Sequence, residues 1–102
     1  MSAVNDHINA TERAIRSAED AKSMAGIGGE NTLNEAENLI IRIRDEFSGL
    51  AWSQDEEFQD IIEKADDILD EFKTEARSNW LVGAIGDLRT NLERLRDELN
   101  NG

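Results

Sequence analysis

The chain has 102 residues, with 23 acidic side chains against 11 basic ones and a net charge of −12. That charge disfavours direct binding to nucleic acid or to anionic membranes, because both are negatively charged themselves. The absence of cysteine removes disulfides, thiolate metal sites and cysteine nucleophiles, and the length indicates one domain, residues 1–102, with a modest core.

Apolar residues recur three or four positions apart along nearly the whole chain, and no useful stretch alternates with period two. The pattern predicts an all-α fold, an antiparallel bundle of three or four helices with coiled-coil-like packing. The expected helices are residues 3–25, 32–51, 54–78 and 80–99.

The first expected helix carries a narrow apolar stripe that thins to alanine, which lets a neighbouring helix approach closely. His7 lies near its start and is expected to be a surface side chain. The run Gly26-Ile27-Gly28-Gly29 should end the helix, because glycine adopts the left-handed conformations that a helix C-terminus needs. The stripe consists of Val4, Ile8, Thr11, Ile15, Ala18, Ala21 and Ala25.

The second expected helix begins with Thr32-Leu33-Asn34-Glu35, the pattern of a capping box in which hydroxyl and carboxylate satisfy free backbone amides. A second pattern of this kind, Ser53-Gln54-Asp55-Glu56, is expected to start the third helix. The apolar stripe between the two boxes is Leu33, Ala36, Ile40, Ile43, Phe47 and Leu50.

Most of the negative charge lies in the third expected helix. Residues 53–78 carry 10 acidic and 3 basic side chains, a balance of −7 out of −12. A halophilic surface coat should be spread more evenly, so this concentration favours a local role. Phe58, Ile61, Ala65, Ile68 and Phe72 take the core positions a and d of a heptad. The outward-facing carboxylates, which we call the acidic strip, are Glu56, Asp60, Glu63, Asp66, Asp67, Asp70 and Glu71.

Carboxylates three and four residues apart on a helix stand about 5–6 Å from one another and repel, so folding alone does not favour the acidic strip. We therefore interpret the chain as a non-catalytic binding module whose acidic strip engages a basic protein, as an adaptor or as an inhibitor that mimics nucleic acid. This resembles the strategy of small acidic anti-restriction and anti-CRISPR proteins, and the resemblance is electrostatic.

The fourth expected helix has its apolar residues one position out of phase with the third. The phase slip favours a turn near Ser78-Asn79 over one continuous helix of residues 54–99. Trp52 and Trp80 each precede a helix start and are expected to be partly buried anchors, with interface contacts as the alternative. The apolar residues of this helix, called the leucine stripe below, are Leu81, Ile85, Leu88, Leu92, Leu95 and Leu99.

The leucine stripe offers an alternative function, that of a structural or assembly protein that self-associates through it as a homodimer. A third, remote alternative comes from the carboxylates. Glu56-Glu57-x-x-Asp60 and Glu63-x-x-Asp66 resemble in residue type the magnesium-binding motifs of the all-α nucleoside triphosphate pyrophosphohydrolases of the MazG type. That family sets its motifs across two facing helices, whereas here both lie on one.

One further resemblance covers the twelve residues 65–76, ADDILDEFKTEA. They are similar to the acidic third-helix motif in the coiled-coil domains of plant resistance proteins. The upstream tryptophan-leucine segment of that family is missing, so convergence on an acidic amphipathic helix is the preferred explanation.

No window approaches the roughly 18 apolar residues of a membrane span, and the N-terminal sequence lacks an apolar run behind a basic start. We therefore expect a cytoplasmic protein that binds no membrane, no nucleic acid directly and no cofactor. Its expected partners are a protein with a basic surface and a second copy of the chain.

Overall fold

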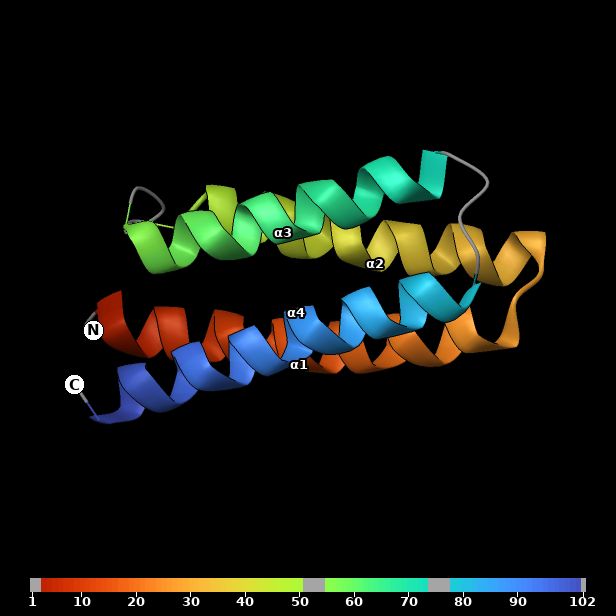
Figure 1. The fold of residues 1–102 in the computed structure, drawn as a ribbon. Coiled ribbons are helices and arrows are strands. Elements are labelled where there is room, and N and C mark those ends of the chain that lie inside the picture. Colours follow the sequence, from red (N-terminus) through yellow and green to blue (C-terminus); the bar gives the residue numbers. More distant parts are fainter. Residues whose placement is uncertain (1–2, 51–54, 74–77, 102) are drawn as a thin grey trace.

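In the computed structural model the described part of the chain forms four helices, each antiparallel to the one before it (Figure 1). The structure describes residues 3–50, 55–73 and 78–101, and the side chains of all of these except residues 3, 4, 78 and 79. Each helix packs against its neighbour in sequence, and the last helix returns beside the first. The predicted antiparallel all-α bundle is confirmed in its four-helix form. The helices are α1 (Ala3–Ile27), α2 (Glu30–Ser48), α3 (Glu56–Lys73) and α4 (Ser78–Asn101).

The predicted break between the third and fourth helices is also confirmed. α3 ends at Lys73, and α4 runs back beside it from Ser78 (Figure 1). A continuous helix would have placed the leucine stripe about 100° around the helix from the apolar stripe of α3, because the two are one residue out of phase. Residues 51–54 and 74–77 lie outside the described residues, and the predicted capping box at Ser53 falls partly there. The first turn of α3 is closed by the Asp55 carbonyl, which accepts hydrogen bonds from the amides of Phe58 and Gln59 at 3.0 and 2.9 Å.

A single core runs along the inside of the bundle. α1 supplies mainly alanines to it, while α2, α3 and α4 supply isoleucine, leucine and phenylalanine. The rings of Phe47 and Phe58 lie 5.6 Å apart, centre to centre, at one end of this core. Five members of the leucine stripe are at most 4% exposed, and Leu99 packs partly buried against them. The stripe is therefore used inside the chain's own bundle.

The turn between α1 and α2 differs from the sequence prediction. α2 begins at Glu30, and its N-cap is Gly29, so Thr32 already lies in the helix and the predicted capping box there is wrong. The Thr32 hydroxyl donates hydrogen bonds back to the carbonyls of Gly28 and Gly29. The physical reason is the pair of glycines at φ 75° and 90°, which reverse the chain tightly enough for α2 to start at once.

The prediction of a surface His7 is wrong as well. The side chain is 1% exposed, and its ring centre lies 5.1 Å from that of Phe58 on α3. α1 is already regular at this point, since the Thr11 hydroxyl donates to the His7 carbonyl at 2.7 Å. Ala10 and Ala14 are buried beside it, so the apolar face of α1 is wider than the stripe read from the sequence.

Two glycine substitutions should change stability in opposite directions. Gly29→Ala forces a side chain into the left-handed region, which should destabilise the fold by about 1–2 kcal/mol. Gly86→Ala lies within α4, where the new Cβ would meet Lys22 at an ordinary contact distance of 3.6 Å. It should stabilise the fold by about 0.5–1 kcal/mol. Thermal unfolding followed by circular dichroism measures both, and a Gly29→Ala variant as stable as wild type would contradict the assigned turn.

Candidate functional site

The acidic strip lies on the outer face of α3. Its members Glu56, Asp60, Glu63, Asp66, Asp67 and Asp70 are exposed, and Glu71 is partly buried. Phe58, Ile61 and Ile68 point the other way and are at most 2% exposed. The structure therefore brings the predicted site residues together along one helix, with the carboxylates on the side away from the core.

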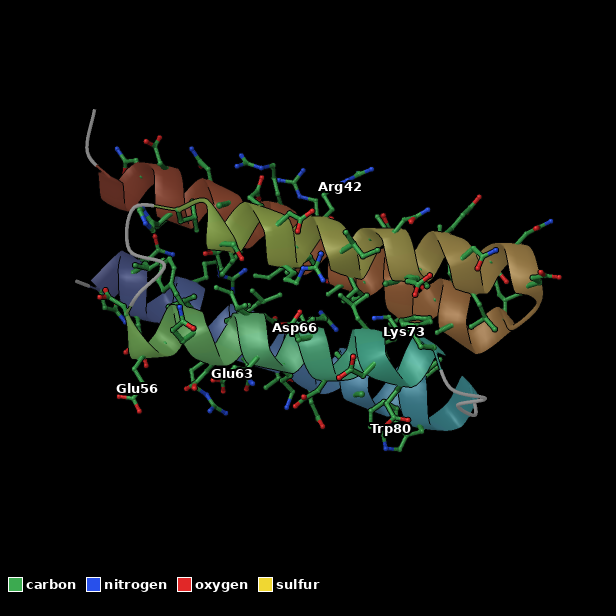
Figure 2. All side chains as sticks on the ribbon, turned by 90° about the horizontal axis from the view of Figure 1, so that it is seen from above. Arg42, Glu56, Glu63, Asp66, Lys73 and Trp80 are labelled. Atoms are coloured by element: carbon green, nitrogen blue, oxygen red, sulfur yellow. The ribbon has the colours of Figure 1, made fainter. Side chains whose placement is uncertain are left out.

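The strip is not uniform, because one of its carboxylates belongs to the contact with α2. Asp66 Oδ1 lies 3.5 Å from an Arg44 guanidinium nitrogen, and Arg44 also contacts Asp45 at 3.1 Å. Both carboxylates raise the pKa of Arg44, Asp45 most of all through the hydrogen bonds that it accepts from the guanidinium. In Figure 2, Asp66 lies between α2 and α3, whereas Glu56 and Glu63 project outward.

The remaining exposed carboxylates form a row that we call the outer row. No ion pair joins any of them to another described residue, and they recur three and four positions apart along α3. α3 offers two bases of its own in the described range, the partly buried Lys64 and the exposed Lys73. The outer row is thus a line of uncompensated negative charge in water, and its members are Glu56, Asp60, Glu63, Asp67 and Asp70.

Three arginines lie on the opposite side of the molecule, and three others, Arg89, Arg94 and Arg96, lie on α4. Arg13, Arg16 and Arg42 line a groove of about 220 Å³ between α1 and α2, where Arg13 contacts Glu46 at 3.3 Å. In Figure 2, Arg42 lies at the edge away from Glu56 and Glu63. The face of α3 that carries the outer row is therefore more acidic than the face between α1 and α2, where these arginines lie among acids.

A contact between two carboxylates lies at the edge of α3 that faces α4. Glu57 and Glu98 line a groove of about 240 Å³ between α3 and α4, together with Asp60 and Arg94. The pKa of Glu57 is raised, first by a hydrogen bond with Glu98 and then by burial and by the charge of Glu98. A charged Glu57 is repelled by the Glu98 carboxylate, so the folded state holds a proton on Glu57 more tightly than the unfolded chain does.

The leucine stripe and the tryptophans have different surroundings. The stripe is buried in the bundle, so self-association through it, which stays a prediction, would require the helices to separate.

Trp80 is 49% exposed, more than an anchor within the core would be. Trp52 lies outside the described residues. Asp87, two turns along α4 from Trp80 on the same face, was not predicted from the sequence as a site residue.

Within the described ranges, no three histidine, aspartate or glutamate side chains are gathered closely enough to hold a metal ion. The carboxylates of the magnesium-binding resemblance, among them Glu57, Asp60 and Glu63, all lie on α3 and spread around its exposed side. None of the helices α1 to α4 has an apolar stretch that could cross a lipid bilayer.

Comparison with known proteins gives no match at any level. No protein-family model, no curated protein and no solved structure matches the chain.

Neutralising the Glu57–Glu98 pair should stabilise the fold at neutral pH. Because folding raises the pKa of Glu57, its contribution to stability is present at low pH and is lost as the pH rises above the ordinary glutamate pKa of about 4.3. Glu57→Gln should therefore raise the melting temperature at pH 7 by about 1–3 °C, the size expected for an exposed like-charge pair. The variant should gain less at pH 4.

Glu56→Gln is the matched control for this prediction. It removes one charge from the same turn of α3, but its side chain projects away from α4 (Figure 2). Equal stabilisation by both substitutions, measured by thermal unfolding between pH 4 and pH 8, would show that overall charge rather than the pair is responsible.

Proposed function

We propose that the protein is a non-catalytic binding module whose outer row on α3 engages the basic surface of a protein partner. The protein acts either as an adaptor that holds this partner or as an inhibitor that occupies the partner's nucleic-acid channel. The observation that supports this most is the outer row itself, a line of exposed carboxylates joined by no ion pair to the rest of the described chain.

The geometry of the outer row supports recognition of an extended basic surface. From Glu56 to Asp70 the helix rises about 21 Å, at 1.5 Å per residue. The row is rigid, because α3 buries Phe58, Ile61 and Ile68 in the core along the same length. Nucleic acid likewise presents a regular line of negative charge to basic proteins. A regular row of carboxylates on a helix can occupy the same basic groove.

The energetics point to a collective interaction. A single exposed ion pair contributes about 0–1 kcal/mol, so no one carboxylate would determine binding. Several like charges on one face steer a basic partner and speed its association, and this effect weakens as salt screens the charges.

Reversing charges in the outer row should abolish binding without unfolding the domain. We expect Asp60→Lys with Glu63→Lys and Asp67→Lys to weaken binding of a basic partner by about 100-fold or more, because attraction becomes repulsion at the centre of the row. The partner is first isolated by affinity capture from the native host. Binding is then measured by calorimetry across a range of salt concentrations, with circular dichroism as the folding check.

The matched control reverses three exposed acids elsewhere. Glu12→Lys with Asp20→Lys and Glu35→Lys changes the net charge by the same amount on α1 and α2. This variant should keep most of the affinity. Equal loss in both variants, or binding of the wild type that does not weaken with salt, would overturn the outer row as the binding surface.

A further inference from the structure

Trp80 stands at the head of a groove on α4. The groove has a volume of about 300 Å³ and is lined by Trp80, Gly83, Ala84 and Asp87. These positions are i, i+3, i+4 and i+7 of one helix, so they share one face and extend for about 10 Å. We call this feature the tryptophan groove.

The floor of the groove is backbone. A Cβ built on Gly83 would have no atom within 4 Å, so the space above this residue is open. Ala84 beside it is partly buried and adds one methyl group. An elongated side chain can therefore lie flat against the helix between the two end walls.

The two walls differ in chemistry. At one end is the Trp80 indole, 49% exposed, and Trp80 and Ile27 are the large apolar side chains most open to solvent among the described residues. At the other end is the carboxylate of Asp87, which is exposed and makes no ion pair with another described residue. Side chains on a helix lean toward its N-terminus, which brings this carboxylate over the groove floor.

We propose that the tryptophan groove binds an arginine side chain presented by the basic partner, an inference that rests on the proposed function. Because the two walls lie at opposite ends of the groove, the apolar stem of an arginine packs on the indole while its planar guanidinium donates paired hydrogen bonds to the carboxylate. A lysine ammonium offers the charge without the planar fork. The net charge of −12 disfavours an anionic occupant.

The position of the groove fits a partner bound along the outer row. α3 and α4 are antiparallel, so the end of α3 that carries Asp70 lies beside the start of α4 that carries Trp80 (Figure 1). In Figure 2, Trp80 projects on the same side as Glu56 and Glu63. A partner lying along the outer row therefore reaches the groove at the Asp70 end.

The test uses N-acetyl-argininamide as the probe, followed in assigned amide NMR spectra of the whole chain. We expect saturable shifts at the Trp80 indole and at the amides of Gly83 and Ala84. N-acetyl-citrullinamide has the same shape without the charge and should bind roughly tenfold more weakly. Asp87→Asn and Trp80→Leu should each reduce the shifts at Gly83 and Ala84. Asp87→Asn keeps the side-chain size, and Trp80→Leu shortens a side chain that is 49% exposed, so both variants should retain the fold.

A matched pair of glycine variants tests the groove itself. Gly83→Leu fills the floor and should abolish the shifts, while Gly86→Ala alters the same helix on the side facing Lys22 and should leave them unchanged. Equal shifts with citrullinamide, or binding that survives Gly83→Leu, would overturn the proposal. Shifts confined to α3 would overturn the groove and leave the outer row standing. Salt-independent partner binding together with saturable shifts at Trp80 would overturn the outer row alone.

Discussion

The bundle depends on the packing of α1 against α4, where alanines of one helix are buried in the same cluster as the leucines of the other. Ala18, Ala21 and Ala25 are fully buried, and their small side chains let α4 lie close along α1. An ion pair of 2.9 Å between Arg89 and Glu19 spans the same two helices at the surface. Because this packing returns α4 beside α1, the leucine stripe is enclosed, and α3 is left with neighbours on two sides and one open face.

The open face of α3 can carry its charge because the core outweighs the repulsion. Burial of a large apolar side chain such as Phe58, Ile61 or Ile68 contributes about 1.5–3 kcal/mol. A like-charge pair at helical spacing costs about 0.2–0.5 kcal/mol. A few buried side chains thus offset the whole outer row. The fold is stable with the outer row present and does not need it for stability. The carboxylates of the row are therefore available for binding.

Most of the architecture was predictable because apolar periodicity reports which face of a helix is buried. That signal located the four helices, the break before α4 and the outward direction of the carboxylates. It could not place His7, since a polar residue near a chain start gives no sign of the Phe58 ring that covers it in the fold. It also misassigned Thr32, because the glycines before it satisfy the turn without a side-chain cap. Contacts between helices, such as Asp66 with Arg44 and Glu57 with Glu98, depend on packing angles that one sequence does not encode locally.

The two exposed features of the α3 and α4 side differ in what they can discriminate. A row of solvated carboxylates attracts any basic surface, and salt weakens it, so it governs the rate of encounter more than the choice of partner. The tryptophan groove combines an aromatic face, an open floor and a carboxylate over about 10 Å. This geometry favours a long side chain with a planar cationic end, such as arginine. Specificity is a difference between affinities, and a directional contact at one end of a non-directional row is sufficient to create it. The division that we propose, attraction by α3 and selection by α4, follows from the antiparallel packing of these two helices, which brings the Asp70 end of the row beside the groove.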